Sequence, residues 1–266
     1  MNGTADSVAI EAHELSKVFH TRKRDVQAVD CVSFRAETGE VFGLLGPNGA
    51  GKTTTLRMLA TILTPSSGWA RLAGFDTREA PHEVRERIGF VAAETGLYDR
   101  FTARETLRFF GRITRLEDAE IDRRSAEIFD LLDLTAIADR RVGTFSTGEK
   151  QKLSLARSII HDPPILILDE PTFGLDVMAA RAVLDTICLL REQGRTIVLS
   201  THIMRVAEKL CDRIGILFGG RLQALGDLET LRNTYGGEDL EDVFFSVVQG
   251  ERNNLSFSDS PDHGMV

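Results

Sequence analysis

Residues 46–53 constrain this sequence more than any other segment. They read Gly-Pro-Asn-Gly-Ala-Gly-Lys-Thr and fit the pattern G-x-x-x-x-G-K-[ST]. The loop follows the short apolar run 41–45, which is typical of a strand covered on both faces, and it opens a helical stretch expected from Lys52 to about Leu63. Glycines let backbone N–H groups close around a phosphate, and a helix N-terminus adds positive potential. A glycine-rich turn that binds nothing is the alternative, and the strand and helix around the loop argue against it.

The residue types in this loop indicate how a nucleotide would be held. The Lys52 side chain can reach the β- and γ-phosphates, and the Thr53 hydroxyl can ligate Mg²⁺. We therefore expect the cofactor contacts to come from Gly46, Pro47, Asn48, Gly49, Ala50, Gly51, Lys52, Thr53 and Thr54.

A pair of acids follows a later core strand. The apolar run Ile165–Leu168 leads directly into Asp169 and Glu170. A carboxylate at the end of a core strand beside a phosphate loop can hold Mg²⁺, and we assign that role to Asp169. Glu170 can reach a water in line with the γ-phosphate and act as the general base. Acids at strand ends are also common as solvated residues, so the assignment depends on the phosphate loop.

A third motif begins a helix at residues 145–152. Ser146 and Glu149 fit the S-x-x-E capping box, and Gly148 removes a side chain where a ligand could approach the helix end. In isolation this motif is more often a well-capped helix that contacts no ligand.

Strands alternate with helices along most of the chain, which predicts an α/β fold with a mainly parallel, doubly wound sheet. A helical character between about Thr102 and Ile160 indicates a lobe inserted between core strands, and Asp239–Val248 has the apolar stripe of a docked helix. Residues 249–266 are predicted to be a polar, disordered tail. The expected strands are Val8–Leu15, Val29–Arg35, Glu40–Leu45, Ile88–Ala92, Ile165–Leu168, Thr196–Ser200, Ile214–Phe218 and Arg221–Leu225, and two further helices are expected at Met178–Gln193 and Met204–Cys211.

Composition excludes several classes of protein. The 266 residues carry a formal net charge of −8, and such an acidic surface disfavours binding to nucleic acid. Three cysteines without a C-x-x-C pair fit thiols in a reducing compartment better than a disulfide framework. No apolar run approaches the roughly 18 residues of a membrane span, so any spanning segment is expected on another polypeptide.

The motifs occur in the order and spacing of the ATP-binding-cassette (ABC) ATPases, which the chain resembles over about residues 8–248. The resemblance implies a P-loop NTPase core, an N-terminal antiparallel β subdomain and a helical subdomain at about 94–162. It also implies hydrolysis of ATP with Mg²⁺, with Glu170, His202 and Lys52 as catalytic residues. Residues Ser146, Gly148 and Glu149 correspond to the family signature, which contacts the nucleotide of a second cassette in a head-to-tail pair. Here Thr147 replaces the usual first glycine and Glu149 the usual glutamine.

Further residues of this sequence match individual functional positions of the family. Phe19 matches the aromatic residue that stacks on adenine, although a phenylalanine near a strand often belongs to the core. Asp176 matches the acid at the dimer seam, and His202 matches the histidine that contacts the γ-phosphate. The family's metal-assisting glutamine is replaced by Ala93, and we expect Glu94 to substitute for it as a metal ligand.

Within the family, residues 94–105, 145–148 and 237–245 are most similar to the sodium-extrusion (Nat-type) subunits. The resemblance implies an ATPase at the cytoplasmic face of the membrane that drives export through a permease subunit. Export of a drug, lipid or polysaccharide is the alternative, and a soluble DNA-repair, chromosome-associated or ribosome-associated cassette or a non-hydrolysing regulator is a more distant one. The cargo, the identity of the second cassette and the role of the acidic tail stay open.

Overall fold

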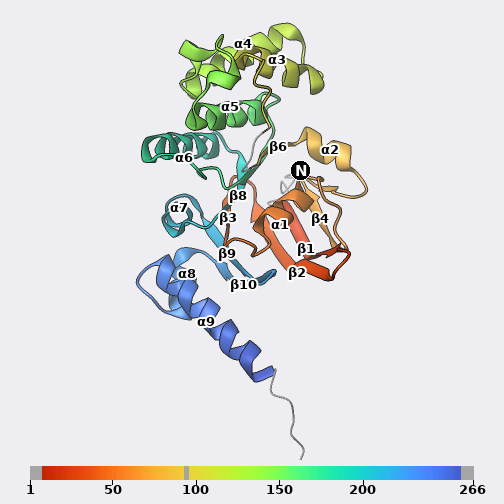
Figure 1. Cartoon of the computed structure of the whole chain (residues 1–266), viewed down its shortest axis with the longest axis vertical. Helices are drawn as coiled ribbons and strands as arrows, with labels where there is room; N and C mark the ends of the chain where they lie inside the picture. Colours follow the sequence, from red (N-terminus) through yellow and green to blue (C-terminus); the bar gives the residue numbers. More distant parts are fainter. Residues whose placement is uncertain (1–7, 93–95, 259–266) are drawn as a thin grey trace, which may run out of the picture.

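Helix α1 packs against two β-sheets, one antiparallel and one mainly parallel (Figure 1). The computed structural model describes residues 8–92 and 96–258, with only the backbone described for 251–258. The smaller sheet has the strand order β2-β1-β4-β5, and the larger has the order β10-β9-β3-β8-β7-β6. The strands are β1 (Val8–His20), β2 (Asp25–Glu37), β3 (Val41–Leu45), β4 (Ser67–Leu72), β5 (Phe75–Asp76), β6 (Ile88–Val91), β7 (Ile165–Asp169), β8 (Thr196–Thr201), β9 (Arg213–Phe218) and β10 (Arg221–Gly226).

The larger sheet is buried on both faces, as its apolar sequences predict. In β7, Ile165 and Ile167 pack toward α1 and the smaller sheet, whereas Leu166 and Leu168 pack toward the helices on the opposite face. Its strands pair in parallel except for the terminal β9–β10 hairpin. The helices are α1 (Lys52–Leu59), α2 (Pro81–Glu86), α3 (Ala103–Ile113), α4 (Asp118–Leu131), α5 (Thr147–Ile159), α6 (Val177–Glu192), α7 (Met204–Leu210), α8 (Leu228–Tyr235) and α9 (Leu240–Ser258), with 3₁₀ turns η1 (Thr135–Ile137) and η2 (Val142–Thr144).

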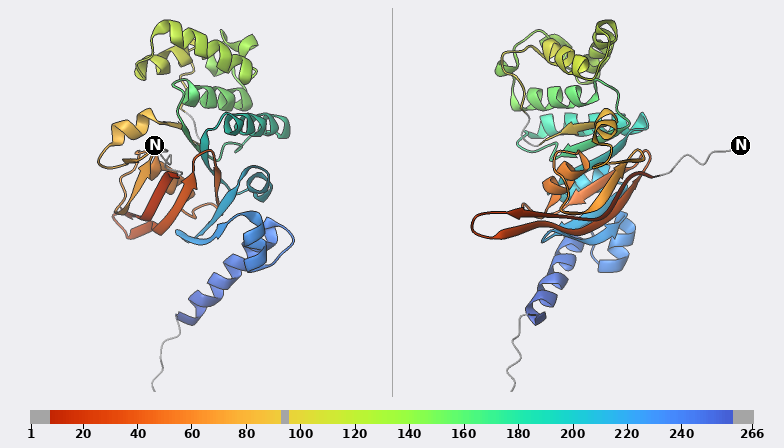
Figure 2. Two further views of the ribbon diagram at one scale, coloured as in Figure 1. Left: turned by 180° about the vertical axis from the view of Figure 1, so that it is seen from behind. Right: turned by 90° about the vertical axis from the view of Figure 1, so that its right-hand side faces the viewer.

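The predicted inserted lobe consists of α3, α4 and α5, and it stands at one end of the molecule (Figures 1 and 2). The chain leaves the sheet after β6 and re-enters it at β7, and these two strands pair directly, with Ile88 opposite Ile165. The predicted fold class of a P-loop core, an antiparallel β subdomain and an inserted helical lobe is confirmed.

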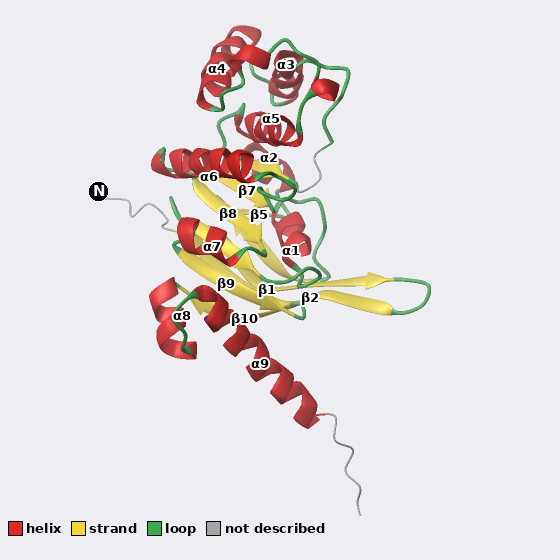
Figure 3. Cartoon of the chain, turned by 60° about the vertical axis from the view of Figure 1, so that its left-hand side comes forward, coloured by secondary structure: helices red, strands yellow, loops and turns green. Residues whose placement is uncertain are grey.

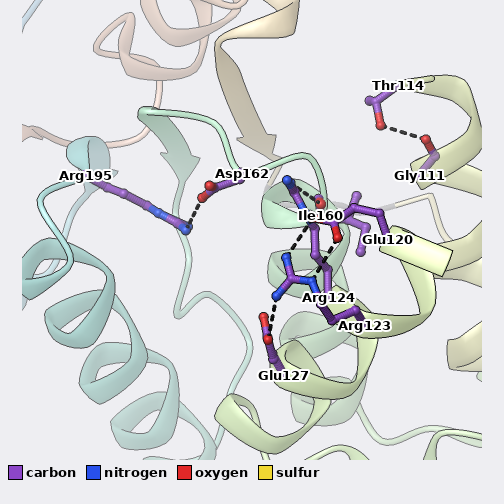
Figure 4. Close-up of polar contacts among 9 residues, drawn as sticks. All are labelled: Gly111, Thr114, Glu120, Arg123, Arg124, Glu127, Ile160, Asp162 and Arg195. Carbon is purple, nitrogen blue, oxygen red and sulfur yellow. Dashed lines mark hydrogen bonds and ion pairs between the residues drawn. The ribbon is translucent and has the colours of Figure 1, made fainter. Parts of the chain in front are cut away.

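Arginine side chains connect α4, α5 and the start of β8 at the base of the lobe (Figure 4). Arg124 of α4 pairs with Glu120 (2.6 Å) and donates to the carbonyl oxygen of Ile160 (3.2 Å). Arg195, which precedes β8, donates to Asp162 at 2.6 Å. Burial lowers the pKa of Arg195, so its contact with Asp162 compensates for lost solvation.

Several predicted boundaries are corrected by long-range contacts. Strand β1 continues past Leu15 because its hairpin with β2 extends to the pair His20–Asp25. Helix α1 ends at Leu59 rather than Leu63, since Thr61 adopts φ +59° and the carbonyl of Arg57 accepts from two later N–H groups. Strands β4 and β5 and helices α2 and α8 were not predicted.

The C-terminal segment also differs from the sequence analysis. Helix α9 docks through Leu240, Val243 and Phe244 and then continues to Ser258 (Figure 2). Residues 249–258 of the predicted tail are therefore helical. No proline interrupts this stretch, and Gly250 alone costs only about 1 kcal/mol in a helix. Among the described residues, no helix is both long and apolar enough to cross a membrane.

Candidate active site

Three neighbouring parallel strands bring the predicted site residues together. The registers place Leu45 of β3 opposite Thr201 of β8, and Asp169 of β7 opposite Ser200 of β8. The carboxyl ends of β3, β7 and β8 therefore meet at one edge of the sheet, beside the start of α1. Figure 3 shows α1 beside β7 and β8. In open α/β sheets this edge is where ligands bind.

The phosphate loop requires glycine at two positions because other backbone lies against it. A Cβ at Gly46 would overlap the carbonyl oxygen of Leu217. Gly51 has φ +104°, and a Cβ there would lie 2.6 Å from the carbonyl oxygen of Ala28. The loop is thus fixed between β2 and β9, with its backbone close to the start of α1.

Lys52 lies inside the loop rather than in solvent. Its side chain is 5% exposed, and Nζ donates to the carbonyl oxygens of Gly46 (2.6 Å) and Pro47 (3.2 Å). The same Nζ lies 3.2 Å from Glu170 Oε1. The ammonium group is therefore buried among oxygen acceptors at the point where a phosphate would enter.

Asp169 is buried and held by two hydroxyl groups. Its Oδ1 accepts from Thr53 Oγ1 at 3.0 Å and from Ser200 Oγ at 2.7 Å. Ser200 Oγ in turn accepts from the backbone N–H of Glu170 at 3.0 Å. A hydroxyl and a carboxylate are hard oxygen donors of the kind that Mg²⁺ prefers, so Thr53 and Asp169 fit the predicted metal. Ser200 was missed because a serine near the end of an apolar strand carries no distinctive signal.

Glu170 connects two other predicted residues through its two carboxylate oxygens. His202 Nδ1 donates to Oε2 at 2.9 Å, while Lys52 faces Oε1. The Glu170 backbone takes φ +48°, which directs the residue after β7 out of the strand direction. The structure thus brings all three predicted catalytic residues together around one carboxylate.

A cavity of about 360 Å³ opens at this point. It is lined by the loop residues from Pro47 to Thr54, by Glu170 and His202, and by Ala28 and Phe173, which the sequence analysis did not select. Phe19 is not among these lining residues. It lies near the end of β1, 37% exposed, with Lys17 Nζ 5.5 Å from its ring centroid.

The signature residues lie apart from the phosphate loop, in the helical lobe at the start of α5 (Figure 1). The predicted capping box is confirmed: Ser146 Oγ accepts from the Glu149 N–H at 3.2 Å, and Glu149 Oε2 accepts from the Ser146 N–H at 2.7 Å. A Cβ at Gly148 would lie 2.8 Å from the Ala179 Cβ of α6. Asp176 caps α6 by accepting from the N–H groups of Met178 and Ala179, both at 2.9 Å.

The predicted substitution near β6 cannot be placed in this geometry. Ala93 and Glu94 lie outside the residues that the structure describes.

Comparisons with known proteins agree with these features. A family model described as "ABC transporter" matches residues 29–173. The "ABC transporter ATP-binding protein NatA" of Bacillus subtilis (strain 168) is 44% identical over 239 residues, which cover 89% of this chain and 97% of that protein. The "Probable multidrug ABC transporter ATP-binding protein YbhF" of Escherichia coli (strain K12) is 38% identical over 253 residues, which cover 93% of this chain but 43% of that protein.

A solved structure described as "Structure of ATP binding subunit of ABC transporter" superposes with a TM-score of 0.81 at 30% identity. The match covers 90% of this chain and 99% of the other.

Proposed function

Because the chain belongs to the ABC transporter family, whose ATP-binding subunits are ATPases coupled to transport, we propose that it drives an exporter through a separate membrane-spanning protein. The observation that carries the proposal is the meeting of Lys52, Glu170 and His202 beside the phosphate loop. We place the subunit at the cytoplasmic face of the membrane, bound to its permease.

Each of these groups has a definite part in the proposed hydrolysis. Glu170 accepts a proton from water, the water oxygen bonds to the γ-phosphorus, and the bond to the β–γ bridging oxygen breaks to release ADP and phosphate. Phosphate oxygens compete with Glu170 for the Lys52 ammonium, which leaves Oε1 available to the water. His202 orients the carboxylate through Oε2. Bound Mg²⁺, held by Thr53 and Asp169, would neutralise phosphate charge.

The remaining cofactor contacts follow from the same proposal. Backbone N–H groups of the loop, together with the start of α1, hold the phosphates, and Phe19, which is 37% exposed and lies outside the cavity lining, would stack on adenine.

A second cassette completes the proposed site. The residues around Asp176 support this part, since Phe173, Val177 and Met178 are 57%, 84% and 77% exposed and give the sheet edge an apolar margin. The signature residues of one cassette would then face the nucleotide on the other. The partner is a second copy or a different cassette of the same family.

The most specific part of the proposal is the identity of the transported cargo. Similarity to the Nat-type subunits at residues 94–105 and 237–245, and the 44% identity to NatA, favour sodium efflux. The named multidrug relative supports an organic cargo as the alternative. Sodium release from sealed vesicles that contain the subunit and its co-purifying membrane partner would distinguish the two.

Glu170→Gln tests the enzymatic core of this function. The amide cannot accept the proton, so ATP turnover falls at least about 100-fold, while ATP binding and an ATP-dependent dimer persist in gel filtration. Glu192→Gln, an exposed change at the end of α6, is the matched control. Turnover at the wild-type rate in Glu170→Gln would contradict the assignment of the base, and absence of ATP binding by the wild type would overturn the whole proposal.

A further inference from the structure

An arginine outside the described site is bound to the signature segment. Arg140 follows η1 and lies six residues before Ser146, the N-cap of α5. Its Nη1 donates to Glu149 Oε1 at 3.2 Å, and its Nη2 donates to the carbonyl oxygen of Thr144 at 2.9 Å. The guanidinium also lies over the ring of buried Phe145, 5.3 Å from its centroid. One side chain thereby joins both ends of the loop that precedes α5.

The contacts leave the Glu149 carboxylate with two partners of different kinds. Oε2 accepts from the backbone N–H of Ser146, and Oε1 accepts from Arg140. The first contact is part of the helix cap, and a glutamine at this position can make it equally well. The second contact is an ion pair, which stabilises the segment electrostatically only while residue 149 carries a charge. The substitution Glu149→Gln therefore removes the ion pair while it keeps the helix cap.

The charge matters because of what the start of α5 would bind. A helix N-terminus attracts phosphate through its free N–H groups and its positive potential. A carboxylate in the first turn stabilises the helix but repels an approaching polyphosphate. Neighbouring Lys150 is paired with Asp99 at 3.2 Å, so among the described residues Arg140 is the cation that pairs with Glu149.

We propose that Arg140 is a positioning residue for ATP: it neutralises Glu149 and fixes the loop 140–146 so that the start of α5 can receive the phosphates bound to the second cassette. This inference rests on the proposed function, because it needs two cassettes that share the nucleotide. It also explains how this chain can carry Glu149 at the signature position where the family usually has a neutral glutamine.

A charge-removal series tests the proposal in the full-length protein. Arg140→Ala is expected to raise the ATP concentration for half-maximal turnover about tenfold, with kcat within about twofold, since it exposes the phosphates to an unpaired carboxylate. Arg140→Ala combined with Glu149→Gln is expected to return KM to within about twofold of the Glu149→Gln single variant. Arg104→Ala is the matched control, because Arg104 lies in the same lobe, pairs with Asp139 at 2.8 Å and covers the ring of Phe129.

A second readout uses the Glu170→Gln background, in which ATP-dependent dimers accumulate. There Arg140→Ala is expected to shift dimer formation to about tenfold higher ATP, and Glu149→Gln is expected to reverse the shift. If Arg140→Ala and the double variant show the same raised KM, the arginine acts only on loop structure and the charge argument is overturned. If Arg140→Ala leaves KM and dimerisation at wild-type values, the proposal fails while the proposed function stands. If neither the wild type nor the Glu170→Gln variant forms an ATP-dependent dimer, the proposed function itself is overturned.

Discussion

Replacing Ser200 by alanine tests whether one hydroxyl group organises both acids of the site. Ser200 is fully buried; its Oγ donates to Asp169 Oδ1 at 2.7 Å and accepts from the Glu170 N–H at 3.0 Å. Alanine removes both contacts without adding volume. Asp169 keeps its bond from Thr53, and the Glu170 N–H keeps a longer bond of 3.2 Å to the Ser200 carbonyl, so neither group is left without a partner.

The size of the effect follows from the kinds of hydrogen bond lost. A hydrogen bond to a charged group contributes about 1.5–3 kcal/mol and a neutral one about 1 kcal/mol, and the remaining contacts offset part of that loss. We expect the free energy of unfolding to fall by about 2–3 kcal/mol. For a chain of this length that corresponds to a decrease in Tm of about 4–6 °C. Turnover should fall at least about tenfold, because Asp169 loses the neighbour that orients it.

Thermal unfolding and steady-state ATPase assays measure the two effects. Ser158→Ala is the control: Ser158 is also buried, but its hydroxyl donates to the Leu155 carbonyl within α5, at 2.8 Å. Its loss should be almost neutral, since alanine favours the helix. If Ser200→Ala melts within about 1 °C of the wild type, or no lower than Ser158→Ala, the hydroxyl does not organise the acids and our reasoning is refuted.

Two further predictions concern a half-buried histidine and the phosphate loop. Burial lowers the pKa of His161, which donates to the Ile88 carbonyl at 3.0 Å, so below about pH 6.5 the unfolded chain binds the proton more readily and stability falls as the pH decreases. His161→Gln should therefore flatten the dependence of Tm on pH between about pH 7 and pH 5. A slope equal to that of the wild type and of the exposed control His20→Gln would contradict this cause. Gly46→Ala should lower ATP affinity at least about tenfold in a binding titration because its Cβ would displace the Leu217 carbonyl from the loop. Gly250→Ala, at a helical glycine with open space around its Cβ position, should leave ATP affinity unchanged, and equal affinity in all three proteins would show that the loop tolerates a side chain.

The sequence predicts the phosphate loop well because strand, loop and helix are consecutive. The same is true of the capping box at Ser146, whose partners are three residues apart. The family resemblance implied that Lys52, Glu170 and His202 act together. Their meeting depends on the strand order β3-β8-β7, which local sequence patterns could not supply.

Other features depend on contacts that leave no mark in the sequence. Ser200 matters only because β7 and β8 are neighbours, and Ala28 and Phe173 line the cavity without any chemically distinctive group. The end of α1 was missed because Thr61 adopts the left-handed conformation that usually indicates glycine. Arg140 could not be selected either, since an arginine six residues before a helix cap is an ordinary surface residue until its contacts are seen.

The pairing of β6 with β7 has a consequence for how such chains can diversify. The whole helical lobe leaves at the carboxyl end of β6 and returns at the amino end of its immediate neighbour β7. Because the two strands are short and parallel, these attachment points are offset by only about 10 Å along the strand direction. An insertion anchored in this way can change its length, its helices or its outer surface without moving either strand. The outer surface of the lobe can therefore vary among related chains while the strands that position Lys52, Asp169 and Glu170 keep their places.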